Sequence, residues 1–347
     1  MHRSRLPLIL ADDNPAARLL SRPGEAIYNA ANGLVEGNNL FQVAWLPDDK
    51  RDHYLAQVQA LAQDRGYRSP QPQIVFEGNT PADVAKNCLL HDLLAASDWP
   101  APTRRVSAWL GEPIAIKEPT AAYFHRQSGS NLLIVGQNDE AAMGMLAIAL
   151  ISLSAQHTPS LSQEEKRGAD LSLPGEGRGG DACFYVFDFS PVDTPYANLL
   201  PRLIDLLPHS VRVGHRRELP DLIAEIAEEV NRRLEEGVTI LRDKPAIYLI
   251  ICGLQRAHDL RQEDDFGLSR FNSTDEAPVP PNPAQQFATI LREGPDLGVH
   301  TLVWCDTLNN LNRTLDRRLL REFDLRVAFQ MNAEDSANLI DTPAASK

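Results

Sequence analysis

From residue 131 onward, short runs of aliphatic and β-branched residues alternate with longer segments of helical periodicity. The runs predict five strands, at 131–135, 183–189, 246–252, 299–305 and 326–329. Between them, the spacing of apolar residues predicts helices near 139–156, 196–207, 217–236 and 284–293. Strands that are apolar along their whole length are typical of a parallel sheet that is buried on both faces. The pattern therefore predicts an α/β fold, a mostly parallel sheet with helices on both faces.

The first hundred residues predict a smaller α/β segment ahead of this sheet. Residues 40–46 are expected to form a strand after a turn-rich stretch, and residues 48–65 are expected to form a helix. Beyond a proline-rich linker, residues 74–77 predict a short strand, and Thr80 is expected to cap a further helix.

The composition is that of a globular protein, with 43% hydrophobic and 23% charged residues in 347. A chain of this length predicts about two domains. Lys and Arg number 34 against 47 Asp and Glu, so the net charge is −13, which disfavours nonspecific binding to nucleic acid or to anionic membranes. The longest apolar run, 141–155, is shorter than the roughly 20 residues of a membrane helix, and the N-terminus shows no signal-peptide pattern. A soluble, cytoplasmic segment is expected, and a longer parent protein could be associated with a membrane.

The cysteines and histidines suggest no metal site. The four cysteines, Cys88, Cys183, Cys252 and Cys305, lie far apart without a CxxC spacing, and three of them lie in apolar runs that predict buried thiols. The nine histidines form no ligand cluster in the sequence, so no metal is predicted.

An open parallel sheet binds ligands beyond the carboxyl ends of its strands, where a helix N-terminus offers free N–H groups. The junction after the first of the five strands can be aligned with the phosphate-binding pattern GxxxxGK[ST]. Its residues are Gly136, Gln137, Asn138, Asp139, Glu140, Ala141, Ala142 and Met143. Ala141 replaces the second glycine, Ala142 the phosphate-binding lysine, and Met143 the hydroxyl residue that holds Mg²⁺. Asp139 and Glu140 add two carboxylates that would repel a triphosphate. The segment is interpreted as a vestigial nucleotide loop.

The strand at 246–252 supports the same interpretation. In an active nucleotide hydrolase the corresponding strand ends in an acidic pair that serves Mg²⁺ and the attacking water, whereas this strand ends in Cys252 and Gly253. These two residues are interpreted as a vestigial Walker B end. Asp188 lies at the end of another strand, and either capping of the next turn or catalysis would explain an acid there; we favour capping.

Several segments together resemble a RecA-like domain of the FtsK/SpoIIIE family of P-loop motor ATPases, most closely a degenerate ATPase domain of the EccC-like tandem ATPases of type VII secretion. The resemblance lies in residues 109–119 leading into 131–136, in 207–226, in 298–308 and in 320–341. It implies a RecA-like P-loop NTPase fold over about 105–341, with ATP and Mg²⁺ as cofactors of the active relatives. The chain departs from the family at both Walker motifs, and Asp306 stands where the family often has a polar sensor residue. No cofactor is therefore expected for this domain.

The same resemblance implies a domain organisation. Residues 1–70 are expected to be the closing hairpin and helix of a preceding domain, and residues 71–104 a linker with a short strand and a helix. Residues 105–347 are expected to be the degenerate RecA-like domain, truncated at its C-terminus. Neighbouring ATPase domains of the same chain are then its expected partners, and the parent protein is expected to form a homo-oligomeric ring.

The nature of the translocated substrate is left open by the sequence. Two long segments, 157–181 and 255–282, are expected to be loops. The second would face the pore of such a ring. Because this segment is acidic, DNA is disfavoured as the substrate and a protein partner is the plausible one. The locally basic runs 212–217 and 313–321 could contact phosphate or a neighbouring subunit, although solvated helix faces are the more common explanation. Arg321 and Arg326 are candidates for an arginine that acts on a neighbour's nucleotide; a structural role at a strand start is the alternative for Arg326.

Two functions follow from these observations. The favoured one is a segment of a multi-domain FtsK/SpoIIIE-type translocase whose domain here is a non-hydrolysing structural or regulatory module. The alternative is an active ATP-binding motor domain that couples hydrolysis to the translocation of DNA or protein.

Overall fold

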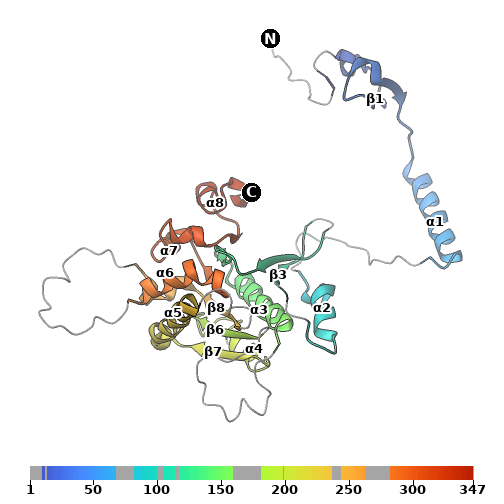
Figure 1. Cartoon of the computed structure of the whole chain (residues 1–347). Coiled ribbons are helices and arrows are strands. Elements are labelled where there is room, and N and C mark those ends of the chain that lie inside the picture. The colour runs from blue at the N-terminus through green and yellow to red at the C-terminus, as the bar shows by residue number, and fades with distance from the viewer. Residues whose placement is uncertain are drawn as a thin grey trace, which may run out of the picture. The chain divides into compact units, whose positions relative to one another are not determined.

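The computed structural model of the chain describes residues 10–11, 14–67, 82–100, 103, 105–114, 117–158, 181–197, 199–236, 244–262 and 282–346. These residues belong to two compact units, 1–75 and 76–347, and each unit is described by itself. Figure 1 labels the helices and strands of both units.

The first unit contains a β-hairpin and one helix. Strands β1 (Glu25–Asn29) and β2 (Asn38–Gln42) pair antiparallel, so the strand expected at 40–46 begins two residues earlier and ends at Gln42. The Asn38 side chain, at the start of β2, accepts hydrogen bonds from Asn29 at the end of β1 and from Asn14 before it. Helix α1 (Asp48–Asp64) confirms the expected helix, but its apolar side chains, such as Val58 at 64% exposure, contribute nothing to a core within this unit.

The second unit begins with a short helical region. A 3₁₀ turn, η3 (Val84–Lys86), leads into α2 (Cys88–Ala95), whose first turn is capped by the Asn87 side chain. The strand expected at 74–77 and the cap expected at Thr80 lie outside the described residues.

The centre of the second unit is a six-stranded parallel sheet, which confirms the predicted α/β fold with a mostly parallel sheet. Its strands are β5 (Leu132–Val135), β6 (Ala182–Asp188), β7 (Ser210–Gly214), β8 (Ala246–Cys252), β9 (Val299–Cys305) and β10 (Leu325–Ala328). They are arranged in the order β10-β5-β9-β8-β6-β7, and every neighbouring pair is parallel. Five of the six strands are those that the apolar runs predict.

Helices cover both faces of this sheet (Figure 1). On one face lie α3 (Asp139–Gln156) and α4 (Leu199–Ile204), and on the other lie α5 (Leu219–Glu236) and α6 (Pro283–Glu293). The apolar side chains form one buried cluster on each face, because successive strand residues point in opposite directions. Eleven residues of α3 are buried, as its apolar sequence predicts.

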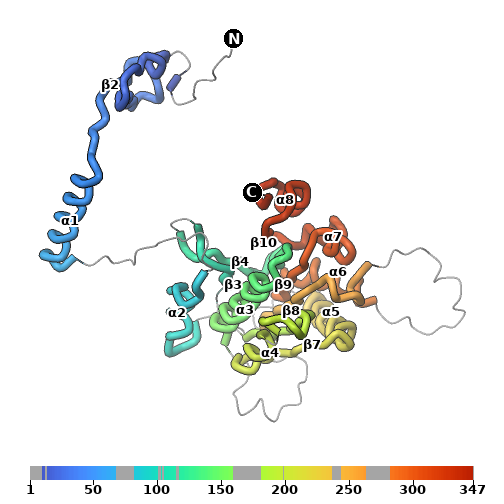
Figure 2. The backbone as a smooth tube through the Cα atoms, turned by 180° about the vertical axis from the view of Figure 1, so that it is seen from behind, coloured from blue at the N-terminus to red at the C-terminus, as the bar shows by residue number. Residues whose placement is uncertain are grey.

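Three further elements complete the unit. The antiparallel hairpin of β3 (Val106–Gly111) and β4 (Thr120–Phe124) packs against α3, where the Trp109 amide donates to Ser152 Oγ at 3.1 Å. Figure 2 shows β3 and α3 side by side from the back. Helices α7 (Leu308–Leu311) and α8 (Ala333–Ile340) lie near the C-terminal end of the described chain, before and after β10.

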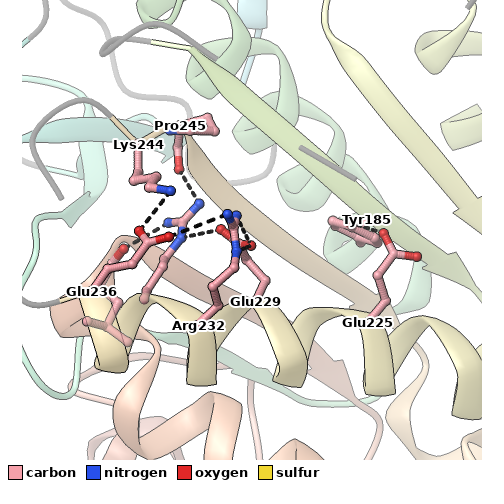
Figure 3. A network of polar contacts seen from close by, with 9 residues as sticks. Tyr185, Glu225, Glu229, Arg232, Glu236, Lys244 and Pro245 are labelled. Carbon is pink, nitrogen blue, oxygen red and sulfur yellow. Dashed lines mark hydrogen bonds and ion pairs between the residues drawn. The ribbon is translucent and has the colours of Figure 1, made fainter. Parts of the chain in front are cut away.

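A polar network joins α5 to the sheet (Figure 3). The guanidinium of Arg233, which is fully buried, pairs with Glu229 at 2.7 Å and donates to the backbone carbonyls of Leu297 and Pro245, at 2.9 Å each. Those carbonyls precede β9 and β8, so Arg233 holds the starts of two strands to one helix. Lys244 pairs with Glu236 at 2.8 Å beside it.

The cysteines are placed as predicted. Cys183, Cys252 and Cys305 are buried and Cys88 is exposed, all as free thiols. Burial raises the pKa of Cys183 to about 11, and raises those of Cys252 and Cys305 to about 12. Across the described ranges, no helix combines the length and the apolar character that a bilayer crossing requires.

Candidate functional site

The residues aligned with the phosphate loop and with the Walker B end lie at the carboxyl edge of the parallel sheet, after β5 and at the end of β8. From β5 the chain passes through α3 to β6 on one side, and from β9 it passes through α7 to β10 on the other. β5 and β9 are adjacent, and the chain leaves them toward opposite faces of the sheet, from β5 toward the face of α3 and from β9 toward the face of α7. This divergence is the topological switch point at which open α/β sheets bind ligands. A ligand site in this fold is expected beside Gly136.

The turn after β5 is closed tightly against two other strands. The Gly136 amide donates to the Cys305 carbonyl at 3.1 Å, and the Gly136 carbonyl accepts from Trp304 Nε1 at 3.0 Å. Gly136 has φ = +147°, and a Cβ on it would overlap the Phe329 side chain that follows β10. Both backbone polar groups of this glycine are therefore used within the protein.

Helix α3 begins only three residues after Gly136, at Asp139. Asn138 caps it, because its Oδ1 accepts from the Ala141 amide at 3.0 Å. The positions aligned with the second glycine, the lysine and the hydroxyl residue of a phosphate loop are therefore already helical. Ala142 and Met143 are both 0% exposed and belong to the apolar cluster under α3. A side chain at the lysine position points into the core and away from the helix N-terminus.

The helix N-terminus carries negative charge and a tyrosine that the sequence did not reveal. Asp139 and Glu140 lie in the first turn of α3, and the Tyr196 hydroxyl donates to Asp139 Oδ2 at 3.2 Å. Burial and the neighbouring Asp139 carboxylate raise the pKa of Tyr196, so the phenol stays protonated and keeps donating. Because the two residues are 57 positions apart in the sequence, no local pattern announces the pair.

The end of β8 offers no acid. The Cys252 side chain is fully buried, and its pKa of about 12 results first from burial and then from the charge of Asp188. Its sulfur lies 3.7 Å from Ser190 Oγ. Gly253 has φ = +88° and starts the 3₁₀ turn η7 (Leu254–Arg256). A neutral buried thiol followed by glycine supplies neither a hard ligand for Mg²⁺ nor a base for water.

Two further carboxylates near this edge accept hydrogen bonds within the turns that they begin. Asp188 Oδ1 accepts from the Ser190 amide at 2.9 Å, which is the capping role favoured from the sequence. Asp306 accepts from Asn310 Nδ2 at 2.9 Å and from the Thr307 hydroxyl at 3.2 Å. In the part of the chain that the structure describes, no three His, Cys, Asp or Glu side chains are grouped so that they could hold a metal ion.

The two candidate trans-acting arginines line a cavity together with other residues of η11 (Leu319–Glu322) and α8. Arg326 donates to the carbonyls of Phe323, Leu339 and Leu320 at 2.7, 2.7 and 2.9 Å, which is the structural role named as the alternative. Arg321 is exposed. The action of either arginine on a neighbouring subunit stays a prediction.

The acidic segment expected to face a pore, 255–282, lies mostly outside the described residues. Within its described beginning, Arg256 donates to the Phe189 carbonyl at 2.8 Å and Arg261 to the Gln255 carbonyl at 2.9 Å. In the basic run 212–217, Arg212 pairs with Glu225 of α5, whereas Arg216 and Arg217 are exposed. The other expected loop, 157–181, is described only at its two ends.

No family model matches the sequence, and no curated protein does. Among solved structures, the chain is similar to the cytoplasmic domain of the type VII secretion ATPase EccC from Thermomonospora curvata, with a TM-score of 0.46 and 14% identity over 85% of this chain and 32% of that one. It is similar to ATPases 2 and 3 of EssC from Geobacillus thermodenitrificans, with a TM-score of 0.43 and 14% identity over 78% and 42%. The conjugation coupling protein TcpA of pCW3, a monomer form with ATPγS, has a TM-score of 0.43 and 11% identity over 86% and 75%. The chain thus spans less than half of the first two structures.

Proposed function

We propose that this chain is a segment of a multi-domain FtsK/SpoIIIE-type translocase and that its α/β domain is a non-hydrolysing structural or regulatory module. One observation carries the proposal. The side chains aligned with the phosphate-binding lysine and the Mg²⁺-binding hydroxyl, Ala142 and Met143, are both 0% exposed in the core under α3. This burial supports the proposal, because neither position is open to a phosphate group or to Mg²⁺ beside the turn.

The charge at the α3 N-terminus supports the same proposal. A helix N-terminus attracts anions because its free N–H groups and dipole carry about half a positive charge. Here Asn138 uses one of the N–H groups, and Asp139 and Glu140 place two negative charges in the first turn. A triphosphate approaching this turn would meet repulsion from both carboxylates without the lysine that offsets it in active relatives.

The proposed module acts through its neighbours. Its partners would be the adjacent ATPase domains of the same parent chain, assembled as a homo-oligomeric ring, and hydrolysis would take place in those domains. A net charge of −13 favours a protein substrate over DNA for the assembly, because phosphate neutralisation supplies most nonspecific DNA affinity.

Nucleotide titration of the full chain tests the proposal. ATPγS and ADP are titrated with and without Mg²⁺ in a calorimeter, and we expect no saturable binding. Micromolar affinity that depends on Mg²⁺ would refute the module and favour the active motor domain.

A charge-neutralised variant separates charge from geometry. D139N/E140Q removes both carboxylates at the α3 N-terminus and should still not bind nucleotide, because Ala142 supplies no ammonium group. The matched control is E334Q/D335N at the N-terminus of α8, which also has an asparagine cap and carries two acids in its first turn. Nucleotide binding gained by the first variant alone would contradict the geometric part of the argument.

DNA binding is tested in a separate measurement. Fluorescence anisotropy with a labelled duplex at low salt should show no saturable binding by the full chain. Binding that weakens steeply as salt rises would favour a DNA-translocating subunit instead.

A further inference from the structure

An open cavity of about 390 Å³ lies among residues of α7, η11, β10 and α8, and it shares no residue with the vestigial nucleotide loop. Its polar lining consists of Arg317, Arg321, Arg326, Asn312, Asn338 and Asp341. Cavities of roughly 300–1,000 Å³ are typical of small-molecule sites. Three arginines and one aspartate around one cavity give it a positive charge in a chain that is strongly acidic overall.

Arg326 is the fixed member of this group. Its guanidinium donates one hydrogen bond to each of three backbone carbonyls, those of Phe323, Leu339 and Leu320. A guanidinium has five N–H groups, so two remain for another acceptor. None of the three acceptors is a carboxylate, and the positive charge of Arg326 is therefore not neutralised by them.

Arg317 and Arg321 have no acidic partner within the described ranges. The nearest acid before them in the sequence, Asp316, is used otherwise, because its Oδ1 accepts from the amides of Arg318 and Leu319 at 2.9 and 2.7 Å. Both arginines are exposed and line the same cavity as Arg326. Guanidinium groups that surround one space match the planar geometry of a carboxylate or a phosphate.

We propose that this cavity is a binding site for a small oxyanion, a carboxylate or phosphate group held by Arg317 and Arg321 over the fixed guanidinium of Arg326. The amides of Asn312 and Asn338 can donate to the same oxygens. Asp341 lines the cavity as well and lowers its affinity for an anion. The site goes beyond the proposed function, since it requires no nucleotide at the sheet edge and no neighbouring subunit.

Thermal unfolding of the full chain with increasing inorganic phosphate or succinate tests the site, with sodium chloride adjusted to hold ionic strength constant. Ligand that binds only the folded state raises the unfolding temperature with the logarithm of its concentration once that concentration exceeds Kd. We expect such a rise with at least one of the two anions, and the anion that acts at the lower concentration identifies the oxyanion. An unfolding temperature that neither anion raises above that in sodium chloride of the same ionic strength would overturn the proposal.

Three variants assign the effect to the cavity. R317A/R321A should weaken binding roughly tenfold, because it removes two charge-assisted contacts. D341N should tighten it several-fold; Asp341 has φ = +57°, a conformation that asparagine adopts well, so the change is mainly one of charge. R216A/R217A, an exposed arginine pair outside the cavity, should leave binding unchanged. Equal weakening by both arginine pairs, or a D341N variant that binds no more tightly, would contradict the site.

Discussion

Acidification should destabilise this protein through one buried side chain, His300 of β9. His300 is 3% exposed, and its Nδ1 lies 2.8 Å from the Ser130 carbonyl, to which it donates. Its ring stacks on Tyr248 and lies against Phe124. Burial lowers the pKa of His300 to about 4; the hydrogen bond to Ser130 opposes this, and the charges of Arg126, His157 and His125 add to it.

The magnitude follows from linkage. In the unfolded chain a histidine has a pKa near 6.5. Below that pH, His300 binds a proton in the unfolded state but stays neutral in the folded state until the pH approaches 4. The contribution of neutral His300 is complete above pH 6.5 and is lost as the pH falls toward 4. At 1.36 kcal/mol per pKa unit, the expected loss between pH 7.5 and pH 5 is about 2 kcal/mol.

The assay compares urea unfolding of the wild type and H300N at pH 7.5, 6.5, 5.5 and 5. Asparagine keeps a donor near the position of Nδ1 but does not titrate, so the pH dependence is the readout and the absolute stability is not. The wild type should lose about 2 kcal/mol more than H300N over this range. H91N, at an exposed histidine of α2, should follow the wild type. Parallel pH profiles of wild type and H300N would refute the reasoning.

Three further substitutions test the candidate site and the polar network around Arg233. A142K should not restore nucleotide binding in the titration above and should lower the free energy of unfolding by more than about 3 kcal/mol, because it buries a charge in the core; unchanged stability would contradict the assigned orientation. G136A should cost about 1–3 kcal/mol in denaturant unfolding, and F329A in the same chain should recover part of the loss that comes from overlap; a fully additive double variant would count against that contact. E229Q should cost about 3–5 kcal/mol because it leaves the Arg233 guanidinium buried without its carboxylate, and a loss below 1 kcal/mol would show that the pair is dispensable.

The central sheet could be predicted from the sequence because its strands are buried on both faces. Continuous apolar runs such as 246–252 need no partner information to be recognised, and α3 was predicted to the residue. The sequence does not predict the strands of the β3–β4 hairpin. They are short and partly buried, and their apolar and polar residues do not alternate clearly. Strand β2 ends at Gln42 although apolar residues continue beyond it, which shows that β propensity does not by itself set the end of a pairing.

The candidate site could be predicted in its chemistry but only partly in its geometry. The absence of the phosphate-binding lysine and of the Walker B acids can be read from the sequence. The contacts of Gly136 with Trp304 and Phe329 join residues far apart in the chain, so no local pattern predicts them. The burial of Ala142 could be predicted from the sequence, because Ala142 is the first of the apolar residues at helical spacing that continue with Leu146, Ala149 and Leu153.

The four thiols differ in exposure, so that one of them can be labelled selectively. Thiolate is the species that reacts with maleimides, and burial holds three of the thiols protonated while Cys88, in the first turn of α2, is open to solvent. A fluorophore should therefore couple to the native chain at one position and in one copy per molecule. Energy-transfer measurements between subunits or to an added partner could then be made without replacing any cysteine.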